Sequence, residues 1–309
     1  MTRASTTPAS PFACTRCGAG FAGPSDLPCP LCGGAIAGRE PELHVPDGRL
    51  VLGARLGAGR ATEVFEARWT THDGVERDVA LKRIRADQRA NARVRERFER
   101  EADRLAMAIP GVVPLLAIAE TDDGARALVL PRYDRSLRAG RGRHEVTDVG
   151  ATLARALRAL HERELLHRDL HPANVLLDLR APHAGPAIAL ADLGHAWRRG
   201  ESPLTPEGHA VGTRGYLAPE VLAGDPATAA SDVYSLGVVL FEQLAGERPF
   251  ACPDPDEELR RITTETAFPL ASYERAHTVS RELASLVDAM IARSPEARPR
   301  VDDVVAALG

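Results

Sequence analysis

The sequence is poor in aromatic residues, which make up 4% of its 309 residues, and it lacks any long apolar run. Its longest apolar stretch, residues 236–241 with their flanks, is far shorter than the roughly 20 residues that a membrane-spanning helix needs. The N-terminus lacks the basic start and the apolar stretch of a secretory signal. We therefore expect no membrane span and a cytoplasmic location.

Charge of one sign is not in excess either, because the formal net charge is only −4. This balance gives no global electrostatic reason to expect nucleic acid or an anionic membrane as the main partner. Hydrophobic residues at 44% and charged residues at 27% are typical of soluble globular proteins. The length allows one large domain and a small appendage.

Cysteine is scarce, with five in the chain, but four of the five form two closely spaced pairs. The pairs are Cys14 with Cys17 and Cys29 with Cys32, each with two residues between and a glycine after. This spacing lets both thiolates of a pair bind one cation, and four thiolates close the tetrahedron of a structural zinc site. The segment resembles a zinc ribbon, in which Zn²⁺ supplies the folding free energy that so short a segment lacks. Two disulfides or four free thiols remain the alternatives.

The N-terminal part of the chain divides into three predicted segments. Residues 1–11 are rich in Thr, Ser, Ala and Pro and predict a disordered tail, and residues 12–36 form the zinc-ribbon-like segment. Residues 37–48 carry glycine and proline and predict a linker to the domain at residues 49–309. Arg16 is the only basic residue between the first and the last of these four cysteines, so the ribbon favours a protein partner over nucleic acid.

From residue 49 the pattern becomes strand-like in three pieces, residues 49–57, 63–69 and 76–84. Between the first two pieces, Gly57 and Gly59 allow backbone N–H groups to approach a phosphate chain closely. A Gly-x-Gly between strands also fits an ordinary hairpin turn, so this motif is weak by itself.

The third strand-like piece contains the run Val-Ala-Leu-Lys that ends at Lys82. The following segment predicts a helix, because its apolar residues recur at helical spacing: Val94, Phe98, Leu105 and Ile109. Glu101 falls in the middle of this apolar stripe. An unpaired carboxylate that faces a protein core destabilises the fold by several kcal/mol. Removing one partner of a buried ion pair, for example, costs roughly 3–5 kcal/mol. Lys82 is the simplest candidate partner for Glu101.

Three further motifs follow in order along the chain. An amphipathic run at residues 149–160 leads to His-Arg-Asp-Leu-His-Pro-Ala-Asn at residues 167–174. A strand-like run from Ala187 ends in Asp-Leu-Gly at residues 192–194. Residues 212–220 read Gly-Thr-Arg-Gly-Tyr-Leu-Ala-Pro-Glu.

These motifs, in this order, resemble the Ser/Thr protein kinase family of the bacterial, eukaryotic-like type. The resemblance covers about residues 49–308 and implies an α+β, two-lobed fold with a small β-rich N-lobe and a large helical C-lobe, here preceded by the small four-cysteine zinc ribbon. It implies transfer of the γ-phosphate of ATP to Ser or Thr hydroxyls of protein substrates, with Mg²⁺ as cofactor, autophosphorylation and a role in intracellular signalling.

The resemblance also implies a role for each matching residue. Asp169 is expected to orient the substrate hydroxyl and accept its proton, while Asn174 and Asp192 bind Mg²⁺. The Lys82–Glu101 ion pair is expected to position the α- and β-phosphates. The residues expected to contact the nucleotide are Gly57, Gly59, Val64, Ala80, Lys82, Leu130 as gatekeeper, Arg132 and Tyr133 of the hinge, Asn174, Leu176 and Asp192.

The same resemblance predicts two structural anchors. Asp232 precedes a helix at residues 233–244 that is apolar on nearly every face, and this aspartate is expected to hold the backbone of the catalytic loop. Near the C-terminus, Arg298 is expected to pair with Glu220 of the Ala-Pro-Glu motif.

Regulation can be inferred from the same residues. Arg168, directly before Asp169, is typical of kinases whose activation segment is ordered by a phosphate, and Ser202 and Thr205 are candidate phosphosites. Thr213 is expected to contact Asp169 structurally, so a phosphate on Thr213 should inhibit.

Three positions depart from the family pattern. Thr62 replaces the third glycine of the phosphate loop and Leu193 replaces the usual Phe, and both changes are common. His171 stands where Ser/Thr kinases usually carry a lysine that stabilises the transferring phosphate, and we count it with the catalytic residues. A neutral imidazole supplies less charge there, so we expect a live enzyme with one of two properties: a lower activity, or an activity that rises as His171 protonates.

Two other functions are alternatives to this interpretation. The first is a pseudokinase scaffold that binds nucleotide and partner proteins, and His171 is the residue that favours it. The second is a small-molecule phosphotransferase, which the Ala-Pro-Glu motif at residues 218–220 makes less favoured.

Overall fold

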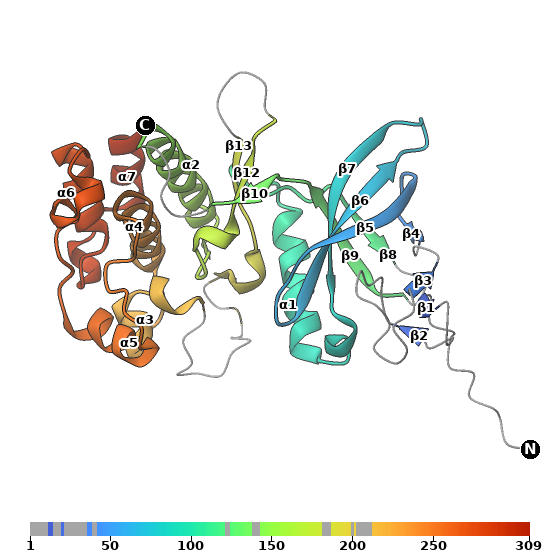
Figure 1. Cartoon of the computed structure of the whole chain (residues 1–309), viewed down its shortest axis with the longest axis horizontal. Coiled ribbons are helices and arrows are strands. Elements are labelled where there is room, and N and C mark those ends of the chain that lie inside the picture. The colour runs from blue at the N-terminus through green and yellow to red at the C-terminus, as the bar shows by residue number, and fades with distance from the viewer. Residues whose placement is uncertain are drawn as a thin grey trace, which may run out of the picture. The chain divides into compact units, whose positions relative to one another are not determined.

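Figure 1 shows the computed structural model of the chain. The structure describes residues 12–14, 20–21, 36–38, 42–120, 124–137, 143–180, 187–198, 201 and 212–309. Within it the chain divides into two compact units, residues 1–95 with 115–132 and residues 96–114 with 133–309.

The first unit is built around a closed barrel with the strand order β4-β5-β6-β7-β9-β8. Its strands are β4 Glu42–His44, β5 Arg49–Ala58, β6 Thr62–Thr70, β7 Glu76–Ile84, β8 Ala117–Glu120 and β9 Arg126–Pro131. β5, β6 and β7 confirm the three strand-like pieces of the sequence. All three pair antiparallel with their neighbours, and two register shifts interrupt the β5–β6 pairing, one between Leu52 and Arg55 and one between Arg55 and Gly57.

Side-chain alternation divides each barrel strand between a core face and an outer face. On β7, Val79 and Leu81 belong to the apolar cluster of the barrel together with Phe65 of β6. Ala80 and Lys82 must therefore point to the opposite face of the same strand.

β4 lies within the segment for which the sequence predicted a linker, residues 37–48. Residues 42–44 pair with β5, and His44 also pairs with Glu120 of β8, which closes the barrel. The reason is burial, because Leu43 and the neighbouring Val45 enter the core cluster. The predicted linker is therefore wrong for residues 42–44.

Three short strands precede the barrel in the sequence: β1 Phe12–Cys14, β2 Gly20–Phe21 and β3 Ile36–Gly38. They form an antiparallel sheet in the order β2-β1-β3. Cys17, Cys29 and Cys32, which are predicted zinc ligands, lie outside the described residues.

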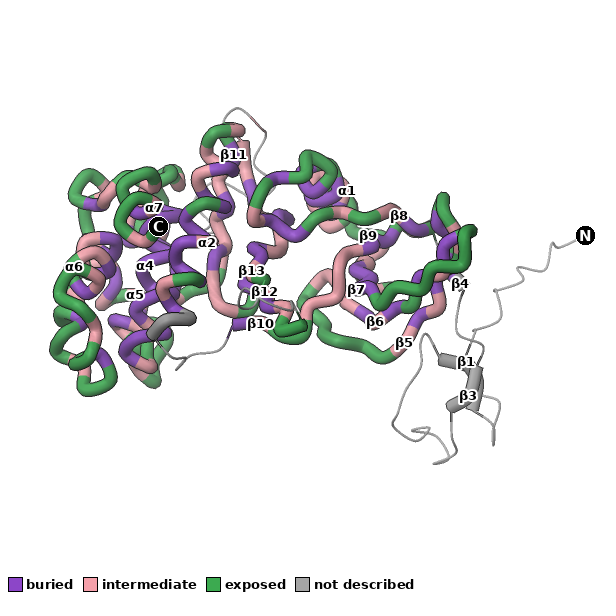
Figure 2. Tube along the Cα trace, turned by 90° about the horizontal axis from the view of Figure 1, so that it is seen from above, coloured by how far each residue is buried: buried purple, intermediate pink, exposed green. Residues whose placement is uncertain are grey.

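The second unit is mainly helical. Its helices are α2 Arg143–His161, α3 Pro219–Ala223, α4 Ala229–Ala245, α5 Pro255–Thr264, α6 Arg281–Met290 and α7 Val301–Leu308. The end of α1, which spans Ala92–Leu105, also belongs to this unit from residue 96 onward. α4 is buried over almost its whole length, as its all-round apolar sequence predicts, and it is drawn mainly in the buried colour in Figure 2.

Two small antiparallel sheets in the second unit carry the segments between the helices. The first has the order β10-β12-β13, with β10 Arg135–Ser136, β12 Val175–Asp178 and β13 Ala187–Leu190. The second pairs β11 Leu165–Leu166 with β14 Trp197–Arg198. Because Val175 lies opposite Leu190, the residues just before β12 and just after β13 are neighbours.

Candidate active site

The glycine-containing turn of the first unit joins β5 to β6. Gly59 donates its backbone N–H to the carbonyl of Thr62 at 2.8 Å, which closes the turn. A Cβ atom added at Gly57 would meet nothing within 4 Å, so the backbone there is open to an approaching group. Thr62 is not among the residues with positive φ, so its backbone does not need a glycine. This explains structurally why the departure at Thr62 is tolerated.

One face of the barrel carries four of the predicted nucleotide contacts. Val64 lies opposite Lys82 in the β6–β7 ladder, and Ala80 lies opposite Leu130 in the β7–β9 ladder. Lys82 is 7% exposed and has a partner, so the strand lysine is a buried cation and not a solvated edge charge. The strand pairing thus brings these residues together on one surface.

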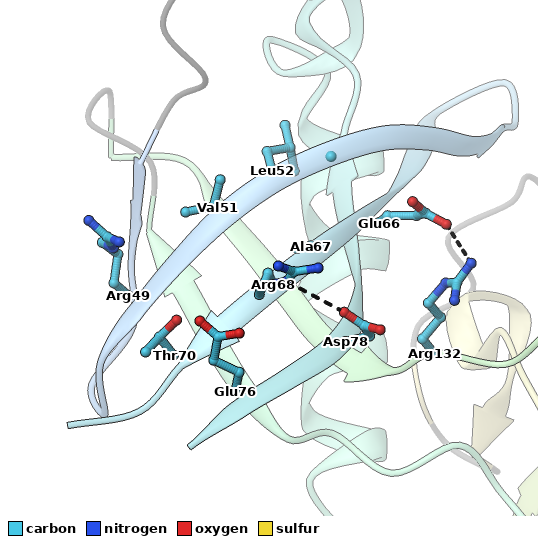
Figure 3. A pocket seen from close by; sticks show the side chains of 11 residues that line it. Arg49, Val51, Leu52, Glu66, Ala67, Arg68, Thr70, Glu76, Asp78 and Arg132 are labelled. Atoms are coloured by element: carbon cyan, nitrogen blue, oxygen red, sulfur yellow. Dashed lines mark hydrogen bonds and ion pairs between the residues drawn. The ribbon is translucent and has the colours of Figure 1, made fainter. Parts of the chain in front are cut away.

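A pocket of about 460 Å³ opens further along the same strands (Figure 3). Arg132 at its rim forms an ion pair with Glu66 at 2.5 Å, and Arg68 lies 3.8 Å from Asp78. Of the predicted nucleotide contacts only Arg132 lines this pocket, so it is not the predicted site.

The catalytic-loop motif of the second unit is anchored by the buried carboxylate of Asp232. The backbone N–H groups of His167 and Arg168 each donate to Asp232 at 2.9 Å, and Nε2 of His161 lies 2.9 Å from the same carboxylate. Burial by itself would raise the pKa of Asp232, but the hydrogen bond from His161 and the other donors outweigh it and hold this pKa below its ordinary value. The predicted anchoring role of Asp232 is confirmed.

Two residues of the second unit have backbone conformations that side chains other than glycine seldom adopt. Arg168 has φ of 67° and Asp192 has φ of 64°. Such strain persists only where surrounding contacts impose it, and it clusters at functional sites. At Arg168 the imposing contact is the N–H donation to Asp232.

The backbone carbonyl and the carboxylate of Asp169 both accept hydrogen bonds that fix its position. Asn174 donates its side-chain N–H to the carbonyl of Asp169 at 2.9 Å. Thr213 donates both its backbone N–H and its hydroxyl to Oδ1 of Asp169, each at 2.8 Å. The predicted contact between Thr213 and Asp169 is therefore confirmed.

Gly212 makes this contact possible. Its φ of 128° favours glycine, and an added Cβ atom would lie 2.6 Å from the carbonyl oxygen of Arg168. The close approach of the two chain segments at this point requires the absence of a side chain.

Asn174 and Asp192 lie at the same end of the β12–β13 pair. Ala191 donates its backbone N–H to the carbonyl of Asn174 at 2.8 Å, and Asp192 accepts a hydrogen bond from the N–H of Gly194 at 3.1 Å. An amide oxygen and a carboxylate in neighbouring segments are oxygen ligands of the kind that Mg²⁺ prefers. Leu176 follows on β12.

The Ala-Pro-Glu motif is tied to the C-terminal end of the chain by a two-pronged ion pair. Arg298 donates to the two carboxylate oxygens of Glu220 at 2.8 and 2.7 Å, and its side chain is fully buried. Burial alone would raise the pKa of Glu220, but the hydrogen bonds from Arg298 and Ser231 lower it. The predicted pair of Arg298 with Glu220 is confirmed.

Comparison with known proteins agrees with this geometry. The family model described as "Protein kinase domain" matches residues 50–307. The chain belongs to the protein kinase family. It is 34% identical over 264 residues to serine/threonine-protein kinase PkaB of Streptomyces coelicolor, a match that covers 82% of this chain and 60% of that protein.

Two mycobacterial members of the protein kinase family are similar as well. The chain is 32% identical over 270 residues to serine/threonine-protein kinase PknB of Mycobacterium tuberculosis, covering 82% of this chain and 41% of that protein. It is 38% identical over 215 residues to serine/threonine-protein kinase PknF of the same species, covering 65% and 44%. The chain thus spans 60% or less of the length of these relatives.

His171, which departs from the kinase pattern, lies close to Asp169. Its Nε2 is 3.8 Å from Oδ1 of Asp169, and its ring centroid is 6.0 Å from that of Tyr216. Burial lowers the pKa of His171 although Asp169 acts in the opposite direction. The imidazole is therefore neutral near pH 7, and this member of the kinase family lacks a full positive charge at the position.

Glu101 is buried at 3% exposure, as the apolar stripe of its helix predicts. It belongs to the second unit and Lys82 to the first, and both residues have partners. Their mutual ion pair stays a prediction.

Sequence reasoning missed two residues of the second unit. Arg104 of α1 is buried and donates to the carbonyl of Leu193 at 3.1 Å and to Glu201 at 2.6 Å. Arg104 follows Glu101 by three residues, on the stripe that already indicated burial, and this was the available signal. Glu201 carried no signal of its own.

Among the helices that the structure describes, none combines the length and apolarity needed to cross a membrane. Ser202 and Thr205, the predicted phosphosites, lie outside the described residues.

Proposed function

We propose that this chain transfers the γ-phosphate of ATP to Ser or Thr hydroxyls of protein substrates. The observation that carries the proposal is the fixed position of Asp169, whose carboxylate and carbonyl are held by Thr213 and Asn174. A carboxylate held in this way can orient a substrate hydroxyl and accept its proton.

Asn174 and Asp192 would hold Mg²⁺, because their segments meet at one end of the β12–β13 pair. When bound, the metal ion neutralises charge on the phosphates of the nucleotide. The surrounding protein fixes the donor positions through the backbone, since Asp192 lies at a left-handed φ of 64° beside Gly194.

In the first unit, Lys82 would contact the α- and β-phosphates, and Val64, Ala80 and Leu130 would contact the adenine. Their common strand face supports this assignment. The open backbone at Gly57 would lie over the phosphates. Gly59, Arg132, Tyr133 and Leu176 complete the proposed nucleotide contacts, and Glu101 is the proposed partner of Lys82.

His171 would act as a hydrogen-bond donor to the transferring phosphate, with less charge than a lysine. We therefore propose a kcat lower than that of a kinase with lysine at this position. In a pseudokinase, by contrast, the same residue would abolish phosphate transfer.

The full chain, incubated with labelled ATP, Mg²⁺ and a generic protein substrate, tests the proposal. We expect label on serine and threonine of the substrate, and of the chain itself, with at least a 100-fold loss in Asp169→Asn and Lys82→Ala. Transfer no greater than in these two variants would refute the kinase activity. ATP binding without transfer would then identify a nucleotide-binding scaffold.

We also propose that Cys14, Cys17, Cys29 and Cys32 hold one structural Zn²⁺, and that the resulting ribbon contacts a protein partner. The paired spacing of the cysteines and the antiparallel β2-β1-β3 sheet in the same segment support this. A reducing compartment such as the cytoplasm is part of the proposal, because the thiolates must stay reduced to bind the metal.

Zinc content tests this part independently of catalysis. Metal analysis of the full chain purified under reducing conditions should give about one zinc per chain, lost in Cys14→Ser with Cys17→Ser. Cys252→Ser is the matched control, because Cys252 lies outside the paired motif in the second unit.

A further inference from the structure

Five arginines of the second unit form a group, and three of them contact one acidic side chain. Arg97, Arg100 and Arg104 share a face of α1, because they are three and four residues apart. Arg198 of β14 and Arg168 of the catalytic loop complete the group, which we call the arginine cluster.

The arginines influence one another's ionisation. Burial lowers the pKa of Arg104, and the charges of Arg100 and Arg198 lower it further. Burial likewise lowers the pKa of Arg168, the charge of Asp232 acts in the opposite direction, and Arg104 and Arg97 lower it by smaller amounts. Like charges held together out of water need an anion among them.

Glu201 supplies this anion. Its Oε2 accepts a hydrogen bond from Arg104 at 2.6 Å and one from the backbone N–H of Arg198 at 3.3 Å, and it lies 3.7 Å from Arg100. Its backbone is fixed as well, since Glu201 donates its N–H to the carbonyl of Arg198 at 3.1 Å and accepts from Nε1 of Trp197 at 3.2 Å.

Arg104 connects this anion to the Asp-Leu-Gly turn. Its second guanidinium nitrogen donates to the carbonyl of Leu193, the residue that directly follows Asp192. One buried guanidinium thus joins Glu201 to the turn that presents the proposed Mg²⁺ ligand. The helix that carries Arg104 also carries Glu101, one turn earlier.

The cluster retains capacity for negative charge. Nε of Arg168 and Nε of Arg198 are buried and have no hydrogen-bond partner among the residues that the structure describes. Arg97 is directed to Nε2 of His195 at 3.3 Å, and because a guanidinium only donates, this nitrogen accepts. An anion that replaced Glu201 would therefore meet several donors.

We propose that Glu201 is a positioning residue that acts through Arg104 on Asp192, and that its carboxylate fulfils the role of a phosphate in the arginine cluster. Activity then does not require phosphorylation of the segment that follows the Asp-Leu-Gly turn. This inference rests on the proposed kinase function and specifies how that same site is regulated.

Kinetics of four full-length variants test it: Glu201→Ala, Glu201→Gln, Arg104→Lys and the control Glu257→Gln. Glu257 is a matched control because it also pairs with two arginines, Arg260 and Arg261, but on the exposed side of α5. Both Glu201 variants should lower kcat/KM for MgATP by about 10- to 100-fold, a range usual for coupling between sites, while the control stays unchanged.

Chemical rescue separates positioning from a general loss of structure. Acetate or formate should restore activity to Glu201→Ala, whose shortened side chain leaves room for a small carboxylate. Neither should restore Glu201→Gln, whose uncharged amide still fills the space. Failure of rescue in Glu201→Ala, or equal activity of all variants, would overturn the proposal.

Wild-type protein treated with a phosphatase tests the claim that the carboxylate of Glu201 replaces a phosphate. Mass spectrometry should show an unphosphorylated chain that keeps most of its kcat. Loss of kcat by 10-fold or more after dephosphorylation would overturn the claim that Glu201 replaces a phosphate.

Hydrogen exchange keeps this test distinct from the test of kinase activity. The amides of Gly194 and Ala196 are bonded within the turn, to Asp192 and to the carbonyl of Leu193. Their exchange should accelerate in Glu201→Gln but not in Glu257→Gln, whether or not the chain transfers phosphate. Unchanged exchange in Glu201→Gln would overturn the positioning role, and a wild type without phosphotransfer would overturn only the proposed function.

Discussion

Thr213 donates two hydrogen bonds to one oxygen of Asp169, from its backbone N–H and from its hydroxyl, both 2.8 Å long. This arrangement joins the segment before the Ala-Pro-Glu motif to the catalytic loop across 44 residues of sequence. It makes the position of the proposed catalytic carboxylate depend on a single threonine.

Replacement of Thr213 by valine should therefore lower kcat by about 10- to 100-fold, because the hydroxyl is lost while the shape is kept. Thr213→Ser retains the hydroxyl and should keep most of the activity. Steady-state kinetics of the two variants with one protein substrate provide the measurement, and equal rates would contradict a role for the hydroxyl. Thr213→Glu, which places a negative charge against Asp169, should be inactive.

Asp232→Asn should lower the free energy of unfolding by about 3–5 kcal/mol, since an amide cannot accept from two backbone N–H groups and His161 as the buried carboxylate does. Urea unfolding followed by circular dichroism measures the loss. Asp288→Asn is a suitable control, because Asp288 accepts a backbone hydrogen bond from Leu270 and its burial raises its pKa.

The wild-type protein and Asp232→Asn also allow a test by pH. The pKa of Asp232 is lowered in the folded state, so its stabilisation is fully present above the pKa of an unfolded aspartate, about 3.9, and is lost as the pH falls through the folded value. The stability difference between wild type and Asp232→Asn should stay constant from pH 7 to about pH 5 and narrow below about pH 4. A difference that widens in acid would contradict the lowered pKa.

Substitution of His171 by lysine should raise kcat by about 10-fold or more at pH 7.5, because it places a full charge where burial keeps the imidazole neutral. His171→Ala should lower kcat below the wild-type value, which measures the contribution of the neutral donor. If lysine leaves kcat unchanged, another cation already serves the transferring phosphate.

Glu220→Gln should destabilise the second unit by about 3–5 kcal/mol, because it leaves the buried guanidinium of Arg298 without its counter-ion. Arg298→Lys cannot form both bonds to Glu220 and should lose a comparable amount. In a double-mutant cycle the two losses should not add. Additive losses, measured by urea unfolding, would show that the pair is not a unit.

Local spacing in the sequence determined much of this protein. The 3.6-residue pattern of α1 predicted that Glu101 would be buried, the continuous apolar run predicted that α4 would lie in the core, and the motif from His167 to Asn174 indicated the proposed catalytic loop. These features were predictable because each depends on residues within one element or one loop, where sequence distance and spatial distance agree.

Packing decided the rest. Residues 42–44 complete the barrel by pairing with strands on both sides, although their glycine- and proline-flanked sequence predicted a linker. Arg168 adopts a left-handed backbone conformation that its residue type does not predict. Arg104 and Glu201 are separated by 97 positions in the sequence, and only folding brings their side chains to a distance of 2.6 Å. Periodicity along the chain specifies which face of an element is buried, but the partner that a buried charge meets depends on how distant segments pack together.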